Sequence, residues 1–306
     1  MFFDVIIVGG GPAGLTAGLY ASRAKLKTLL IEKGLIGGQV TTTEFVENYP
    51  GFEEGITGTE LAMKMEKQAK RFGLEIVQGS VESVSLEDNM KRITLEGSDI
   101  YNTKSIIIAS GAHPKHLRIT GEDEFRGKGV SYCATCDGAF FKGENIAVIG
   151  GGDSAVQEGI FLTKFAEKVY IIHRRDKLRA EKLLQERALG NQKIEFVWDT
   201  VVEAIQGNDA VQSLKLKNVK TQEITTLDVQ GVFIYIGYNP NTEFLQDIIE
   251  LDQEGFIITN DLMVTSVPGI FAAGDVRSKN LKQIATAVGD AAIAGVEAEK
   301  YIEENF

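Results

Sequence analysis

One pattern occurs twice in this 306-residue chain and limits the folds open to it: an apolar run of strand type, a glycine-rich turn and a helix-like stretch. The first copy leads from residues 4–8 into the turn that starts at Gly9, and the second leads from residues 145–149 into the turn that starts at Gly150. In such a unit the glycines allow a tight bend and a close approach of the backbone to a pyrophosphate at the helix N-terminus. We therefore predict an α/β protein with two Rossmann-like, three-layer dinucleotide-binding domains, for which the chain is long enough.

The two copies differ where the strand after the helix ends. The first ends on Glu32, and the position 141 residues later is His173, which is followed by Arg174 and Arg175. A carboxylate accepts hydrogen bonds from a ribose but repels a ribose 2′-phosphate, whereas arginines hold that phosphate through charge-assisted hydrogen bonds. The first site is therefore expected to bind an unphosphorylated adenosine ribose, and the second to bind NADPH. A solvated helix start is the alternative interpretation of the basic run that ends at Arg179.

Both cysteines of the chain lie in one motif, Cys133-Ala-Thr-Cys136, shortly before the second glycine turn. A C-x-x-C motif near a strand-helix-strand pattern is typical of redox chemistry, because its sulfurs can close a small ring or act as paired thiols. Zinc is a weaker alternative, since a structural site takes four ligands and the only histidines are His113, His116 and His173. A structural disulfide is the other alternative, although so short a loop removes little unfolded-state entropy. We predict no metal site.

Charge and hydropathy limit the partners and the compartment. A net charge of −11 argues against a nucleic-acid partner, because neutralising phosphates requires a basic face. The first residues lack the basic region of a signal peptide, and the longest uncharged run, 5–22, is interrupted by three consecutive glycines and a proline. We expect no export signal and no membrane span, and predict a cytoplasmic protein. In that reducing compartment the two cysteines should be catalytic rather than structural.

Two short segments that contain proline divide the chain. Residues 112–114 follow one strand-like run, and residues 237–241 follow another. Proline fixes its own φ and disfavours helix before it, so both segments are typical of linkers. We predict a discontinuous first domain, residues 1–112 and 242–306, into which the second domain, residues 113–241, is inserted.

Taken together, these motifs make the sequence similar, nearly from end to end, to the low-molecular-weight bacterial thioredoxin reductases. The similarity includes GGGPAG at 9–14, GGQ at 37–39, ENYPGF at 47–52, CATCDG at 133–138, GGGDSA at 150–155, HRRDKLRA at 173–180 and FAAGD at 271–275. CATCD ahead of the second glycine turn is specific, because the glutathione-reductase type has a wider cysteine pair near its first nucleotide site. The resemblance implies FAD in the first domain, NADPH in the inserted domain, and a homodimer.

The resemblance also assigns roles to individual residues. Glu32 would meet the FAD ribose, and Gln39 and Asn48 would lie beside the flavin. Asp275 and Gln283 would hold the ribityl and pyrophosphate side. The full FAD set is Gly9, Gly11, Pro12, Ala13, Gly14, Glu32, Gln39, Asn48, Gly111, Gly274, Asp275, Lys282 and Gln283. The NADPH set is Gly150, Gly152, Asp153, Ser154, Ala155, His173, Arg174, Arg175 and Arg179.

The implied reaction passes reducing equivalents from NADPH through FAD to the Cys133–Cys136 disulfide, and from there to thioredoxin or a thioredoxin-like protein. Cys136 would face the flavin, and Cys133 would attack the partner. Asp137 is the candidate for moving protons as the sulfurs open and close. The alternative for Asp137 is a turn residue ahead of Gly138.

Some features depart from the family, and other functions stay open. Lys282 stands where many relatives have arginine, Ser110 replaces a threonine, and no motif marks the surface that meets the partner. A relative with another electron donor, such as ferredoxin, or with a small dithiol target is one alternative, and a non-catalytic redox sensor is another. The intact motifs GGGDSA and HRR argue against loss of the NADPH site.

Overall fold

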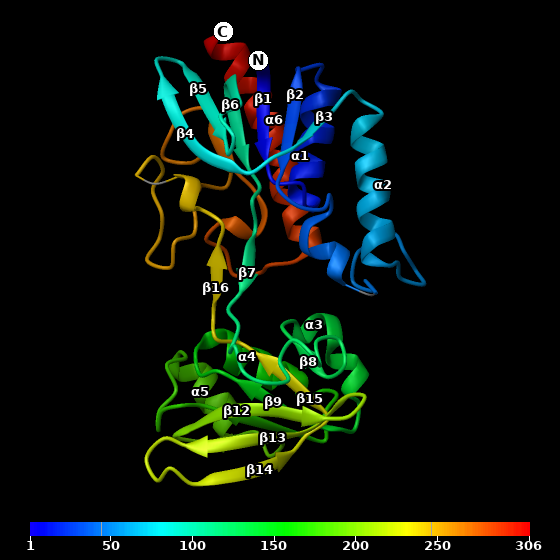
Figure 1. Cartoon of the computed structure of the whole chain (residues 1–306), viewed down its shortest axis with the longest axis vertical. Helices are drawn as coiled ribbons and strands as arrows, with labels where there is room; N and C mark the ends of the chain where they lie inside the picture. The colour runs from blue at the N-terminus through cyan, green and yellow to red at the C-terminus, as the bar shows by residue number, and fades with distance from the viewer. Residues whose placement is uncertain (44, 246) are drawn as a thin grey trace. The chain divides into compact units, whose positions relative to one another are not determined.

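The structure, a computed structural model, describes residues 1–43, 45–245 and 247–306 and divides into two units (Figure 1). Unit 1 consists of residues 1–113 and 239–306, and unit 2 of residues 114–238. The boundaries predicted from the sequence lie after residues 112 and 241. Each unit is described below by itself.

Unit 1 is built on a sheet whose strands are β1 (Phe2–Val8), β2 (Thr28–Glu32), β3 (Glu75–Gln78), β4 (Val81–Glu87), β5 (Met90–Leu95), β6 (Ile100–Ile108) and β17 (Ile270–Ala272). Their order is β3-β2-β1-β6-β5-β4, and β17 pairs with the end of β6. β1, β2, β3, β6 and β17 run parallel, whereas β4 and β5 form an antiparallel hairpin that continues the sheet. All the parallel strands therefore end at one edge, where open α/β sheets bind their ligands.

The helices of unit 1 are α1 (Pro12–Arg23), α2 (Gly58–Lys70) and α6 (Ile284–Asn305), with short 3₁₀ helices η1 (Gly38–Thr42), η3 (Glu243–Leu245) and η4 (Gly274–Val276). Proline at its first position pre-sets the backbone of α1. Thr57 Oγ1 accepts a hydrogen bond from the Glu60 amide and begins α2. Gln283 and Thr286 exchange hydrogen bonds in a capping box that begins α6.

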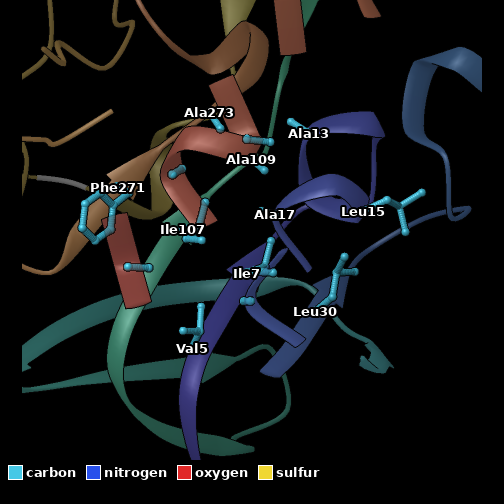
Figure 2. Packing of buried hydrophobic residues seen from close by; sticks show 14 of the residues in the cluster. Val5, Ile7, Ala13, Leu15, Ala17, Leu30, Ile107, Ala109, Phe271 and Ala273 are labelled. Atoms are coloured by element: carbon cyan, nitrogen blue, oxygen red, sulfur yellow. The ribbon is translucent and has the colours of Figure 1, made fainter. Parts of the chain in front are cut away.

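Both faces of the parallel sheet are covered. Val5 and Ile7 of β1 point toward α1 and α6, where Ala17 is among the residues of the same apolar cluster (Figure 2). Their neighbour Ile6 points to the opposite face, which the β4–β5 hairpin and Leu245 cover. Because alternate side chains are buried on opposite faces, these strands are continuous apolar runs in the sequence.

Unit 2 is also an α/β structure. Its parallel sheet contains β8 (Val130–Ser131), β9 (Asn145–Ile149), β10 (Lys168–Ile172), β11 (Ile194–Val197) and β15 (Gly231–Ile234) in the order β11-β10-β9-β15-β8. One face packs on helices that include α4 (Asp153–Leu162) and the short α3 (Ala134–Asp137). The remaining helices are α5 (Lys182–Leu189) and η2 (Gly138–Phe141). The Rossmann-like, three-layer architecture predicted from the sequence is confirmed.

The composition of the third layer of unit 2 was not predicted. This layer is an antiparallel sheet of β12 (Thr200–Gly207), β13 (Val211–Asn218) and β14 (Ile224–Asp228) that packs on the other face of the parallel sheet. The sequence signal of this sheet is the alternation of apolar and polar residues in β13. Leu214 and Leu216 are buried, whereas Lys215 and Lys217 are only partly buried.

The two crossings between the units are short strands, β7 (Ala112–Pro114) and β16 (Tyr238–Pro240), which pair with each other. His113 Nδ1 lies 3.1 Å from Asn241 Oδ1. The two segments that the sequence marks as connections, residues 112–114 and 237–241, thus contain these two paired strands.

The basic run after His173 is an irregular loop, because α5 begins only at Lys182. The alternative interpretation of this run as a solvated helix start is therefore wrong. In the described part of the chain, no helix has the length and apolarity to cross a bilayer. The same residues contain no cluster of three side chains suited to holding a metal ion.

Candidate active site

The first glycine turn contains glycines with different tasks. Gly9 has a φ of +108°, and a Cβ there would overlap the carbonyl of Ala109. A Cβ at Gly14 would overlap the carbonyl oxygen of Gly9, so α1 lies directly against the end of β1. Gly11 has an ordinary extended backbone, and its nearest atom to such a Cβ would be the Gly37 oxygen at 4.0 Å. Gly9 and Gly14 therefore serve the turn, and Gly11 leaves open space at the N-terminus of α1.

Glu32 lies at the end of β2 beside this turn. Its Oε2 accepts a hydrogen bond from the Gly10 amide at 2.5 Å, and its Oε1 accepts one from Gly34 at 2.7 Å. The carboxylate also lines a cavity of about 430 Å³ that includes Gly9 and Ser110. Since each carboxylate oxygen has a second lone pair, Glu32 can still accept a hydrogen bond from a ligand in that cavity.

Asp275 is placed in η4, directly after β17. Its Oδ1 is buried and has no hydrogen-bond partner among the described residues, with Lys279 Nζ 3.4 Å away. Burial raises the pKa of the Asp275 carboxyl, and the Lys279 ammonium acts in the opposite direction. A buried carboxylate oxygen that has an ion pair but no hydrogen bond can still accept one, so this atom is suited to a hydroxyl donor from a bound molecule.

The amides predicted to lie near the same ligand come from distant parts of the chain. Asn48 Nδ2 donates to Gln283 Oε1 at 3.0 Å across 235 positions of sequence. Gln39 donates to the carbonyl of Ala112. Gly274, which precedes Asp275, packs close to Ala13 of α1. The FAD residues predicted from sequence are thus contributed by both segments of unit 1.

Two lysines flank Asp275. Lys279, which sequence reasoning missed, is nearly buried and also pairs with Asp290 at 3.1 Å. Lys282 lies over the ring of Phe256, 4.2 Å from its centroid, and burial lowers the pKa of its ammonium while Asp275 opposes that shift. Positive charge beside an acidic, glycine-rich turn suits a ligand that carries phosphates.

The second glycine turn repeats this design with one substitution. Gly150 has a φ of +151°, and a Cβ there would overlap the Tyr235 carbonyl. Gly152 at the N-terminus of α4 is open, with Arg179 Nη2 at 3.9 Å from a virtual Cβ. The third glycine of the pattern is replaced by the buried Ala155. Asp153 Oδ1 accepts the Glu181 amide at 2.7 Å, and Ser154 is exposed.

His173 and Arg179 lie against this turn, since a Cβ at Gly151 would overlap the His173 ring and the Arg179 amide donates to the Gly151 carbonyl at 2.7 Å. The His173 ring is buried, and its Nε2 has no hydrogen-bond partner among the described residues. Burial, followed by the charge of Arg179, lowers the pKa of His173, which favours the neutral ring. Arg174, Arg175 and Arg179 are exposed, and in the described part of the chain none of them forms an ion pair with a carboxylate. Three uncompensated guanidinium groups in a chain of net charge −11 indicate an anion site.

Cys133 and Cys136 are joined in a disulfide, with their Cα atoms 5.3 Å apart. Cys133 caps α3 and Cys136 lies within it. The Ala134 amide donates to Tyr235 Oη at 2.5 Å, and Thr135 Oγ1 lies 3.4 Å from Cys133 Sγ. The bond makes the pair a redox centre, while the sequence excludes any third thiol.

Asp137 is the last residue of α3. Its Oδ2 accepts a hydrogen bond from Ser131 Oγ at 2.6 Å. Burial raises the pKa of the Asp137 carboxyl above its ordinary value, and the Ser131 hydrogen bond works against that shift. A carboxyl whose pKa is raised, one residue from a disulfide, is suited to exchanging protons with sulfur.

A second polar cluster lies beside the disulfide and was not found from the sequence. Tyr132 Oη donates to Glu122 Oε1 at 2.7 Å and lies 2.9 Å from His116 Nδ1. Glu122 is 2% exposed and also accepts the backbone amides of Leu117 and Arg118. These bonds fix the residue next to Cys133.

Comparison with known proteins gives a consistent result. Residues 3–291 match the pyridine nucleotide-disulphide oxidoreductase family. The chain is 51% identical to a thioredoxin reductase of Listeria innocua, over 99% of this chain and 94% of the relative. It is 50% identical to a thioredoxin reductase of Bacillus subtilis, over 99% and 95%. The crystal structure of thioredoxin reductase from Streptococcus pyogenes matches with a TM-score of 0.93 and 50% identity, covering 99% of both chains. The resemblance predicted from the motifs is confirmed: this chain is an enzyme of the pyridine nucleotide-disulphide oxidoreductase family and a full-length relative of the bacterial thioredoxin reductases.

Proposed function

We propose that the protein is an NADPH-dependent thioredoxin reductase, in which unit 1 binds FAD, unit 2 binds NADPH, and Cys133–Cys136 reduces thioredoxin or a thioredoxin-like protein. The observation that carries the proposal is the Cys133–Cys136 disulfide within a unit whose glycine turn lies against His173 and Arg179. The thioredoxin reductases that match over 94% and 95% of their length support the same conclusion.

Each cofactor has a set of residues suited to it. In unit 1 the open Gly11, the cavity beside Glu32 and the unsatisfied Asp275 oxygen would receive pyrophosphate, adenosine ribose and ribityl hydroxyls. In unit 2 Gly152 would receive the pyrophosphate, and Arg174 and Arg175 the 2′-phosphate. Bound FAD would supply the conversion between a two-electron hydride donor and sulfur chemistry.

The thiol chemistry belongs to the protein. The Cys133 thiolate attacks one sulfur of the partner disulfide, which forms a mixed disulfide and releases the other partner sulfur to take up a proton. The Cys136 thiolate then attacks Cys133 Sγ, so that the internal disulfide returns and the second partner sulfur also takes up a proton. Two electrons and two protons pass from the dithiol to the partner, and Asp137 would carry protons during these steps.

We also propose a homodimer that works in the cytoplasm, where thiols are kept reduced. Size measurement of the purified flavoprotein tests the dimer. A monomer at micromolar concentration would refute it.

The proposed activity predicts a simple observation. The purified protein should be yellow, should bleach on addition of NADPH, and should regain its colour when oxidised thioredoxin is added. A panel of disulfide proteins would identify the partner by the rate of NADPH consumption. A redox sensor would instead be reduced once without sustained consumption of NADPH, and that result would exclude a reductase.

Coenzyme preference should depend on the arginines. Arg174→Ala or Arg175→Ala is expected to cost about 1.5–3 kcal/mol of NADPH binding, the scale of a hydrogen bond to a charged group, which is roughly a 10- to 150-fold rise in KM. The KM for NADH should stay nearly constant, because NADH lacks the 2′-phosphate. Arg187→Ala, which removes an exposed arginine of α5, is the matched control. Equal efficiency of the unmodified enzyme with both coenzymes would contradict the assignment.

A further inference from the structure

Ser131 links both ends of the redox loop, residues 131–137. It is the last residue of β8 and is 5% exposed. Its Oγ accepts a hydrogen bond from the Cys133 amide at 3.0 Å and lies 2.6 Å from Asp137 Oδ2. The same hydroxyl lies 3.3 Å from the Cys133 carbonyl oxygen. One side chain therefore contacts the backbone of the first cysteine and the carboxyl that follows the second.

A hydroxyl has one hydrogen to donate and can rotate it, which gives Ser131 a partner in either protonation state of Asp137. When the carboxyl is ionised, the hydroxyl donates to Oδ2. When the carboxyl is protonated, it can donate to Ser131 Oγ, and the serine hydrogen can turn to the Cys133 carbonyl. No buried polar atom is then left without a partner on proton transfer.

The position of Ser131 is fixed from several sides. Ser131 pairs with Phe233 in the parallel sheet. The next residue, Tyr132, is bound to the buried Glu122. On the far side of the loop, Tyr235 Oη holds the Ala134 amide. The hydroxyl is therefore held at a constant place while the disulfide opens and closes.

Ser131 is the side chain that donates a hydrogen bond to the Asp137 carboxylate. Burial raises the pKa of the Asp137 carboxyl, and the hydrogen bond from Ser131 lowers it. The phenol of Tyr235 lies close enough to Asp137, and to Glu158 of α4, for both carboxylates to raise its pKa. Along the loop, Tyr132 is bound to Glu122 and lies beside His116. Among the described residues no lysine or arginine forms an ion pair with Asp137.

We propose that Ser131 is a positioning residue, which holds the Asp137 carboxyl toward the redox pair in both of its protonation states. The proposal rests on the thiol exchange of the proposed function. In each exchange step Asp137 would accept the proton of the thiol that ionises, Cys133 in the first step and Cys136 in the second, and would give a proton to the partner sulfur that leaves. Two protons thus pass from the dithiol to the partner, and the carboxyl is unchanged over the cycle. Ser131 itself neither gains nor loses a proton.

A titration of the oxidised protein tests the contact without thioredoxin or NADPH. The Asp137 carboxyl carbon is followed by ¹³C NMR, with Asp137→Asn to identify its signal. Ser131→Ala should move the titration to higher pH, because the hydrogen bond stabilised the ionised form. Ser131→Thr, which keeps the hydroxyl, should restore the midpoint, and Ser22→Ala, which removes a buried hydroxyl of α1 with no hydrogen-bond partner among the described residues, should not move it. An unmoved midpoint in Ser131→Ala would overturn the proposal.

Kinetics test the consequence. In Ser131→Ala the rate of thioredoxin reduction should fall about 3- to 10-fold at the pH optimum, the scale of one hydrogen bond, and the alkaline limb should move to higher pH. In an Asp137→Asn background the same change should have no further effect on the profile. If the rate of thioredoxin reduction falls equally at every pH and the alkaline limb of the pH profile does not move, Ser131 has a purely structural role. Ser131→Gly removes the same hydroxyl, and it replaces Ser131→Ala in both experiments if the alanine variant does not fold.

The two tests separate the hypotheses. If no thioredoxin-like protein supports NADPH consumption by the unmodified protein, the proposed function fails. The ¹³C titration still decides whether Ser131 controls the protonation of Asp137. If thioredoxin is reduced and the titration does not respond to Ser131, the positioning role alone is wrong.

Discussion

Replacement of either cysteine, Cys133→Ser or Cys136→Ser, is expected to lower thioredoxin turnover by at least about a thousandfold, because the two sulfurs act as one unit. The chain has no third cysteine that could take over. Both variants should keep their fold, since a loop this short contributes little to stability. The measurement is NADPH consumption in the presence of thioredoxin, with thermal unfolding as the check on folding.

The two variants should nevertheless differ in trapping. Cys133 caps α3 and has the Thr135 hydroxyl 3.4 Å from its sulfur, a donor that can stabilise a thiolate. Cys136→Ser, which retains Cys133, should therefore form a lasting mixed disulfide with a thioredoxin whose second cysteine is replaced by serine. Cys133→Ser should not. The reverse pattern on a non-reducing gel would exchange the roles of the two sulfurs.

The second large effect concerns the first glycine turn. Gly14→Ala places a methyl group on the carbonyl oxygen of Gly9, where both partners are backbone and neither can move aside. We expect a loss of more than about 3 kcal/mol in the stability of unit 1, with loss of bound flavin. Denaturant unfolding and the absorbance of the purified protein measure the two losses.

Gly11→Ala is the matched variant. Its backbone is one that alanine adopts, and the nearest atom to the new methyl group is 4.0 Å away. Stability without cofactor should therefore stay within about 1 kcal/mol of the unmodified protein. Flavin affinity should still fall, because the methyl group occupies the space that a pyrophosphate would approach. Full flavin content in both variants would show that the dinucleotide does not lie at this turn.

The parts of the structure that sequence predicts well are those in which one residue type is required locally. Gly9 and Gly150 adopt positive φ at a bend, so both turns were recognisable, and the runs 145–149 and 168–172 coincide with β9 and β10. The family resemblance implied a disulfide between Cys133 and Cys136, and the bond is present.

What sequence did not reveal depends on contacts between distant residues. Ser131 and Tyr235 are ordinary residues in the sequence, and only the pairing of β8 with β15 brings them to the redox loop. Lys279 lies only four positions after Asp275, but the segment between them is not an α-helix, so the spacing gave no signal that the two side chains pair. The run of basic residues at Arg174 is compatible with a helix start or with a loop, so its charge alone could not show that it lies in a loop.

Unit 1 is made of two segments that a ribosome produces at different times, one before unit 2 and one after it. Unit 2 is complete once residue 238 has emerged, whereas unit 1 then still lacks β17, α6 and the carboxyl of Asp275. Domains generally fold as units during synthesis, so the inserted nucleotide domain should mature first and the β1–β6 sheet should wait with an uncovered face. Nascent chains are thus expected to acquire flavin only in the last step of translation, and premature termination after unit 2 would yield a colourless, folded domain.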